Sequence, residues 1–347
     1  MSHRNNFDLL RFTFAAMVFL FHTHVLSGQA ALAPLSTYLS ADLAVKAFFV
    51  VSGFLVLMSY DRSASVGEYA GKRVRRIYPA YATVVIACAV LGVLISDVPP
   101  AEYFRGIGRY LAANLTFLNF IAPTLPGVFT GNPWTEVNGL LWTLKVEVMF
   151  YASVPLIAWA AARFGRAATL VALYALSVGY LAIMTRAVES TGSLLLLQLS
   201  RQLPGQLAYF VAGIAGYYFV DFFDRRWPLF LAAAGAAYAA IRLGIPRDLQ
   251  FALEPAALAV LVVYAAIGLR YLGNFGRWGD FSYGIYIIHF PVVQTLVALG
   301  VFARDPWLGF AVATLAVLAL AALCWHFVER PFLRRSSHYV LAEAGRT

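Results

Sequence analysis

Charged residues and cysteines are scarce in this sequence. Only 12% of the 347 residues are charged and 61% are hydrophobic, with a mean hydropathy of +0.73. A soluble domain is nearer to a quarter charged and half apolar, so this composition excludes a soluble globular protein. The two cysteines, Cys88 and Cys324, lie in apolar runs without the spacing of zinc ligands. We therefore expect no metal site, and no disulfide can be argued.

Ten apolar stretches have about the length that a helix needs to cross a bilayer. Lipid offers the backbone no hydrogen-bond partners, and the runs are too long and continuous for the strands of a barrel. We predict an all-α, polytopic integral membrane helix bundle with about ten transmembrane helices. One membrane domain is expected over 1–335 and a short cytoplasmic tail over 336–347. The stretches are approximately 7–26, 42–60, 79–97, 138–161, 167–186, 204–221, 228–244, 251–269, 282–301 and 307–327.

The basic residues predict an orientation. With a cytoplasmic amino terminus, 17 of the 26 Lys and Arg residues fall on the inner side, among them Arg4 and Arg346, and seven on the outer side. This bias agrees with the positive-inside rule for an even number of crossings, so we expect both termini in the cytoplasm. Most of the net charge of +9 is explained in this way. Because no nucleic-acid-binding motif accompanies it, we expect no nucleic-acid partner.

The first span contains two ionisable residues, Arg11 and His22. Eleven residues make about three helical turns, so the two side chains should share one face about 16 Å apart. A neutral buried imidazole can take a proton from an attacking hydroxyl near pH 7, which favours a catalytic role. Alternatively, Arg11 reaches the inner surface and His22 is a core histidine. The residues alone leave both interpretations open.

Two further patterns have a structural and a functional interpretation. The Ser52-Gly53 pair in the second span is typical of closely packed membrane helices, and packing is the favoured reading. The cations between Lys72 and Arg76 are expected in an inner loop that opens the third helix. Guanidinium groups there can bind phosphates, or they can anchor the loop to anionic lipid.

The span that follows the long outer connection 98–138 carries a polar stripe. Thr143, Glu147 and Tyr151 are spaced four residues apart, so they should share a helix face. A carboxylate within a span needs a partner. Glu147 is expected either to pair with Lys46 or Lys145 or to orient a catalytic group.

Near the carboxy terminus, Ser282, Tyr286 and His289 should also share one helix face. The tyrosines there can form an interfacial belt. His289 can cap a carbonyl group that Pro291 leaves without a donor, which is the favoured reading before any family is considered. The stretch 326–332 is expected to be an anchor at the inner surface.

Together, and in this order, the motifs resemble those of the membrane acyltransferase-3 family, bacterial O-acyltransferases that modify cell-surface polysaccharides and lipopolysaccharide. The resemblance covers roughly 7–332. An Arg, ten residues and a His match Arg11 and His22. The Arg-x-x-Arg motif matches Arg73 and Arg76.

The other family motifs match with some departures. The Phe-Phe-x-x-Ser-Gly-Phe stretch falls on 48–54, the Ser-Tyr-x-x-Tyr-x-x-His-x-Pro string on 282–291 and Glu-Arg-Pro on 329–331. The usual Trp-Ser-Leu-Ser-Val-Glu-Glu-Gln-Phe-Tyr string falls on 142–151, where this chain reads WTLKVEVMFY. Only Glu147 remains of its two carboxylates, so this chain departs from the family pattern at the second one.

The resemblance implies an enzyme of the bacterial inner membrane. Its donor would be acyl-CoA, most simply acetyl-CoA, and its acceptor a hydroxyl of a carbohydrate or lipid-linked glycan, with membrane lipid around it. A polytopic transporter or flippase is the alternative. The implied catalytic residues are His22, Arg11 and Glu147, with His22 as the base; Arg73, Arg76 and Arg11 would bind the CoA phosphates; and Trp142, Tyr283, Tyr286 and His289 would bind substrate.

Overall fold

A computed structural model describes residues 5–335 and 337–343. Within the expected cytoplasmic tail, residues 336 and 344–347 therefore lie outside the described part of the chain. So do two of the basic residues assigned to the inner side, Arg4 and Arg346.

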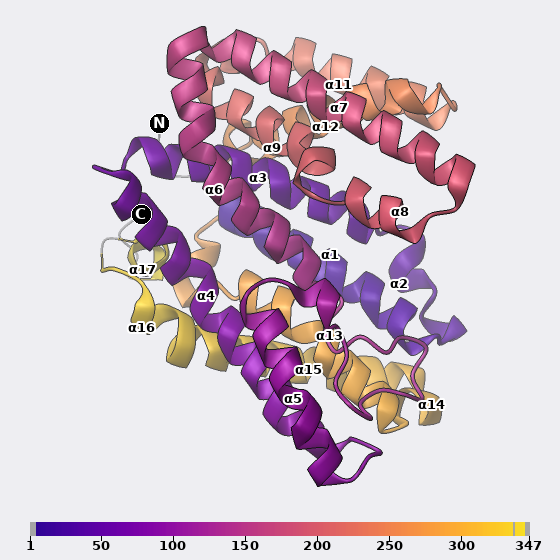
Figure 1. Cartoon of the computed structure of the whole chain (residues 1–347). Coiled ribbons are helices and arrows are strands. Elements are labelled where there is room, and N and C mark those ends of the chain that lie inside the picture. Colours follow the sequence, from indigo (N-terminus) through magenta and orange to yellow (C-terminus); the bar gives the residue numbers. More distant parts are fainter. Residues whose placement is uncertain (1–4, 336, 344–347) are drawn as a thin grey trace. The chain divides into compact units, whose positions relative to one another are not determined.

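The described residues form helices and no strand, which confirms the all-α prediction (Figure 1). The helices are α1 (Phe7–Ser27), η1 (Ala30–Leu32), α2 (Pro34–Thr37), α3 (Ala41–Asp61), α4 (Val66–Leu91), η2 (Gly92–Leu94), α5 (Pro100–Leu115), η3 (Asn119–Ile121), α6 (Leu141–Phe164), α7 (Arg166–Thr191), α8 (Leu194–Ser200), α9 (Leu203–Tyr218), α10 (Val220–Asp224), α11 (Trp227–Arg242), α12 (Arg247–Val263), η4 (Tyr264–Gly268), η5 (Phe275–Trp278), α13 (Ser282–Ala298), α14 (Val301–Arg304), α15 (Pro306–Cys324), η6 (Trp325–Glu329), α16 (Arg330–Phe332) and α17 (His338–Glu343).

Each of the ten predicted spans coincides with a helix, and seven helical segments in the described chain are long and apolar enough to cross a membrane. α13 is apolar but shorter, with 17 residues, and α9 and α11 have 16 residues each. The seven segments are Phe7–Ser27, Ala41–Asp61, Val66–Leu94, Leu141–Phe164, Arg166–Thr191, Arg247–Gly268 and Pro306–Phe332.

The expected inner loop around Arg73 is helical, so that prediction is wrong. α4 begins at Val66 and includes all the cations of this stretch. Its start has the features of a capping box: Ser65 Oγ accepts from the Glu68 amide at 3.1 Å, and Glu68 Oε2 accepts from the Ala64 amide at 2.8 Å. The Ser-x-x-Glu pattern is visible in the sequence, but the charge of the residues that follow it suggested a loop.

The chain divides into two compact units, and four helices contribute to both. The first unit comprises residues up to Leu10, Val45–Ala70 and Val146–Leu272. Within it, α3 and α9 approach so closely that a β-carbon on Gly53 would meet the Phe210 carbonyl, and one on Gly213 would meet that of Val50. This confirms the packing interpretation of Gly53.

The second unit comprises Arg11–Ala44, Gly71–Lys145 and the chain from Gly273 onward. α13 packs along α15, and Gly284 allows this because a β-carbon there would press on Ala321 (Figure 1). The irregular segment before α6 is fastened to α13 by the fully buried Gln294, whose amide donates to the carbonyls of Trp134 at 2.7 Å and Glu136 at 3.0 Å.

Candidate active site

Arg11 contacts Asp280, two residues before α13 begins, and His22 contacts His289 within α13. Arg11 NH2 lies 3.4 Å from Asp280 Oδ2, and His22 Nδ1 lies 3.3 Å from His289 Nε2. Arg11 and His22 are eleven residues apart, and their partners Asp280 and His289 are nine residues apart in the same order. α1 and α13 therefore run in the same direction here. The predicted shared face of Arg11 and His22 is confirmed.

The contacts of the two histidines define their tautomers. His289 Nδ1 lies 2.9 Å from the Ile285 carbonyl, which can only accept, so this nitrogen carries the proton and Nε2 of neutral His289 is an acceptor. His22 Nδ1 lies 2.9 Å from the Val18 carbonyl and 3.3 Å from that acceptor. His22 Nδ1 must therefore be the donor, which leaves the lone pair on His22 Nε2.

The prediction that His289 caps the carbonyl freed by Pro291 is wrong, because another residue bonds to that carbonyl. Pro291 has no amide hydrogen, so the carbonyl that loses its helical donor is that of Ile287, four residues earlier. Asn138 Nδ2 donates to that carbonyl at 2.9 Å. Asn138 thus does the capping, and His289 Nε2 is left to accept from His22.

Arg76 lies in a buried network with two carboxylates. Its NH1 donates to Glu329 Oε2 and its NH2 to Asp280 Oδ2, both at 2.5 Å. Glu329 is only 1% exposed, so the expectation that 326–332 anchors the chain at the surface is wrong for this residue. Asp280 also accepts from Ser282 Oγ at 2.5 Å at the start of α13.

Aromatic rings cover the two arginines of this network. The guanidinium carbons of Arg11 and Arg76 lie 4.7 and 4.3 Å from the ring centroid of Tyr339 in α17. Arg11 NH1 also donates to the Tyr339 hydroxyl at 2.6 Å. The ring of Tyr283, a residue expected to bind substrate, lies 5.4 Å from the Arg76 guanidinium, and its hydroxyl donates to the Ile77 carbonyl at 3.0 Å.

Arg73 and Arg76 are on one helix but in different surroundings. Arg76 is buried, whereas Arg73 is partly exposed and Arg75 is exposed on α4. Two formally positive groups, Arg11 and Arg76, and two formally negative ones, Asp280 and Glu329, leave the buried network neutral. Any excess positive charge along this part of α4 therefore lies with its more exposed cations.

Tyr286 connects α13 to the start of α6. Its hydroxyl lies 2.7 Å from Thr143 Oγ1, and the hydroxyl of Thr143 also bonds to the Leu140 carbonyl at 2.8 Å. The ring of Tyr286 lies 6.3 Å from that of His289. Trp142 is half-buried beside Thr143 in the first turn of α6. Two of the four expected substrate-binding residues, Tyr286 and His289, thus lie together at this junction.

Glu147 lies in the first unit, and the expected pairing with Lys46 or Lys145 is wrong. Glu147 Oε1 accepts from Tyr151 at 2.5 Å and from Ser52 at 3.1 Å. Lys46 instead pairs with both oxygens of Glu254 at 3.1 Å. The polar stripe of α6 is therefore real between Glu147 and Tyr151, and the serine of the Ser-Gly pair binds the carboxylate.

Four residues of the second-unit site were not singled out from the sequence: Asp280, Asn138, Gln294 and Tyr339. A signal existed for two of them. Asp280 precedes Ser282 at the start of a helix, where an acidic residue is favourable, and Pro291 requires some donor for the Ile287 carbonyl. Nothing in the local sequence of Tyr339 or Gln294 indicates their contacts.

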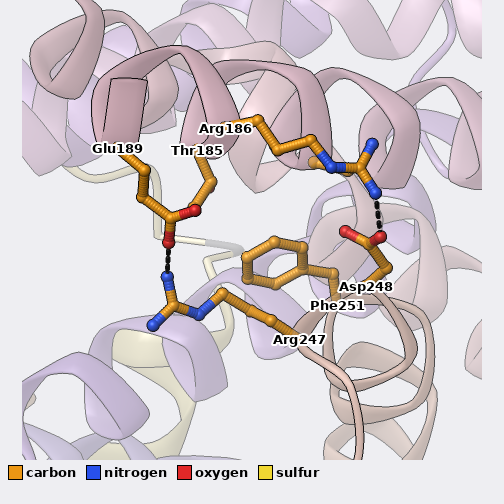
Figure 2. A pocket seen from close by; sticks show the side chains of 7 residues that line it. Thr185, Arg186, Glu189, Arg247, Asp248 and Phe251 are labelled. Atoms are coloured by element: carbon orange, nitrogen blue, oxygen red, sulfur yellow. Dashed lines mark hydrogen bonds and ion pairs between the residues drawn. The ribbon is translucent and has the colours of Figure 1, made fainter. Parts of the chain in front are cut away.

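A separate pocket lies in the first unit, between α7 and the first turn of α12. It has a volume of about 240 Å³. Figure 2 shows Phe251 between two ion pairs, Arg186 with Asp248 and Arg247 with Glu189. All four charged side chains are about half exposed or more, so each pair contributes only about 0–1 kcal/mol.

Comparison with known proteins identifies relatives along nearly the whole chain. A family model described as an acyltransferase domain matches residues 4–326. Nodulation protein 10 of Rhizobium leguminosarum bv. viciae is 32% identical, with 96% of this chain and 94% of the relative covered. An O-acetyl transferase of Shigella phage Sf6 is 28% identical, with 96% and 98% covered. No solved structure matches significantly.

Proposed function

The chain belongs to the membrane acyltransferase-3 family, and we propose that it moves an acetyl group from acetyl-CoA to a hydroxyl of a cell-surface glycan. Membership of this family and its apolar helices make it a multi-pass membrane acyltransferase. The donor, the glycan and the bacterial inner membrane are the proposed part. Both the family and the phage relative favour group transfer over the alternative, a transporter or flippase.

The observation that carries this proposal is the lone pair on His22 Nε2. Because His22 Nδ1 donates to Val18 and His289, Nε2 is the nitrogen that can accept a proton. As it takes the proton of the acceptor hydroxyl, the hydroxyl oxygen forms a bond to the thioester carbonyl carbon. The carbon–sulfur bond then breaks, and the thiolate of CoA takes the proton from His22.

The proposed donor site is the basic part of α4 together with Arg11. Arg73 and Arg76 would meet the phosphates of acyl-CoA, which is made in the cytoplasm, if this end of the helix faces inward. Tyr339 covers Arg11 and Arg76, so the binding of a phosphate by these two residues depends on the position of its ring. We assign acceptor contacts to Trp142, Tyr283 and Tyr286, the orientation of His22 rather than an acceptor contact to His289, and a supporting electrostatic role to Glu147.

We propose ten crossings with both termini in the cytoplasm. The seven long segments become ten when α9, α11 and α13 are added. A 16-residue helix is about 24 Å long, about 6 Å less than the hydrocarbon core of about 30 Å, and thinning of the bilayer accommodates such a mismatch at modest cost. Single cysteines introduced at Gly131 and Ser63, in a chain with Cys88 and Cys324 replaced by Ala, should label from opposite sides of the membrane. Labelling from the same side would contradict the topology.

The catalytic proposal is tested with two histidines of one helix. Membranes that contain the wild type should transfer label from acetyl-CoA to a glycan or lipid fraction, whereas those with His22→Ala should not. His24→Ala is the matched control, because His24 Nδ1 contacts Ser36 Oγ at 2.7 Å, away from His289. Normal transfer by well-expressed His22→Ala would reject the assignment, and absence of label with the wild type would reject acetyl-CoA as donor.

A further inference from the structure

We propose that the carboxy-terminal helix α17 is a latch, in which Tyr339 covers the Arg11–Arg76 pair until acyl-CoA displaces it. This inference rests on the proposed function, because it concerns access of the proposed donor to its phosphate-binding arginines. The relevant residue lies beyond the part of the chain that the family model matches, which ends at residue 326. The family match therefore does not include the contact on which the latch depends.

The contacts of Tyr339 close the arginine pair. Both guanidinium groups lie within 5 Å of the ring centroid, and the phenol oxygen accepts from Arg11 at 2.6 Å. Such contacts are attractive because the ring face carries partial negative charge. With the ring in this position, and with Asp280 and Glu329 bonded to Arg76, Arg11 and Arg76 are only 8% and 7% exposed.

The charges in this cluster are balanced. Arg76 is already bonded to Asp280 and Glu329, and Arg11 lies near Asp280. The two carboxylates balance the two guanidinium groups, so hydrogen bonding to Arg11 rather than net charge would hold a phosphate here. Replacing the Tyr339 hydroxyl on Arg11 by a phosphate oxygen keeps one hydrogen bond to this guanidinium and gives it a charged acceptor.

The attachment of α17 is weak enough for it to move. The helix has six residues, below the length at which helices are stable on their own. Among its described side chains only Ala342 is buried. The Ala342 carbonyl accepts from Asn274 Nδ2 at 2.7 Å, beside η5. A short helix at the end of the described chain is the kind of element that can open locally, as a latch requires.

The latch predicts an unusual direction of change. If the closed form dominates, the apparent affinity for the donor is reduced by the fraction of open molecules. Removing the ring should therefore strengthen donor binding, whereas removing a true ligand-binding or structural residue weakens it. Tyr339→Phe keeps the ring but not the hydrogen bond to Arg11, so its effect should lie between the wild type and Tyr339→Ala.

The experiment measures donor binding by the purified full-length protein. For Tyr339→Ala we expect KM for acetyl-CoA and Kd for coenzyme A to fall about five-fold or more, with little change in kcat. Tyr38→Ala, which removes a tyrosine that is 90% exposed, is the matched control and should leave both unchanged. Unchanged or higher values for Tyr339→Ala would overturn the latch. If the wild type binds no coenzyme A, the proposed donor fails and the latch fails with it.

A second variant tests the latch without removing the ring. Asn274 and Ala342 are hydrogen-bonded neighbours, so Asn274→Cys with Ala342→Cys, in a chain with Cys88 and Cys324 replaced by Ala, is chosen to cross-link α17 in place on oxidation, with the cross-link verified by mass spectrometry. Coenzyme A should bind at least about five-fold more weakly to the oxidised protein than to the reduced protein. Equal binding by the two forms would overturn the latch even if Tyr339→Ala does not fold.

Discussion

His289 Nε2 accepts from His22 Nδ1 across 3.3 Å, and this places the lone pair of His22 on its other nitrogen. A main-chain carbonyl group holds each of the two imidazole rings in place. The Val18 carbonyl and the Ile285 carbonyl each lie 2.9 Å from one Nδ1 atom. Two histidines 267 residues apart thus form a hydrogen-bonded pair, which fits the proposed roles of His22 as the base and His289 as the group that orients it.

The first prediction concerns His289 as the orienting group. His289→Leu removes the acceptor for His22 Nδ1, so His22 can change its tautomer, and we expect kcat to fall at least about ten-fold. His289→Gln offers a carbonyl oxygen as an acceptor and should retain more activity than His289→Leu. The measurement is labelled acetyl transfer at matched protein levels. Equal rates for the two variants would contradict the role of the acceptor.

The second prediction concerns Asn138 and Pro291. Asn138→Ala leaves the Ile287 carbonyl without a donor in a buried position, which should destabilise the protein by about 1–3 kcal/mol. Pro291→Ala supplies a main-chain amide to the same carbonyl, so Asn138→Ala should cost less in that background. Thermal unfolding of the four proteins in detergent gives the coupling between the two positions. Strict additivity would mean that Asn138 does not act through this carbonyl.

The third prediction separates the charge of Glu147 from its hydrogen bonds. Glu147→Gln keeps an oxygen that Ser52 and Tyr151 can donate to, so the melting temperature should change by only a few degrees. If the negative charge supports catalysis, acetyl transfer should nevertheless fall about ten-fold or more. Full activity of this variant would limit Glu147 to fastening Ser52 and Tyr151. Glu147→Leu, which loses both bonds, is the control for structural damage.

Periodicity within one helix made part of the site predictable. The shared face of Arg11 and His22 follows from the helical repeat, because both residues lie on α1 and no other element is needed. The contact between Glu147 and Tyr151 is predictable for the same reason. Chain composition also predicted the helical class, since lipid restricts the backbone to few solutions.

Partners from distant segments were not predictable in this way. Charge alone suggested Lys46 for Glu147, yet Lys46 binds Glu254 and Glu147 binds two hydroxyl groups. Arg76 finds its carboxylate in Glu329, 253 residues away. A sequence shows that a buried charge needs a partner, but several candidates satisfy that need equally well. Packing of the helices selects among them.

The last prediction tests the close approach of α3 and α9. Gly53→Ala places a methyl group against the Phe210 carbonyl, and Gly213→Ala places one against that of Val50. These atoms belong to helix backbones and cannot rotate away, so each substitution should destabilise the protein by about 1–3 kcal/mol. Gly179→Ala on α7 is the matched control: no atom lies within 4 Å of the position that its added methyl carbon would take, and alanine favours the helix. Thermal unfolding in detergent should therefore rank Gly179→Ala at or above the wild type and both other variants below it. If Gly53→Ala and Gly179→Ala unfold at the same temperature, α3 and α9 do not pack closely at Gly53.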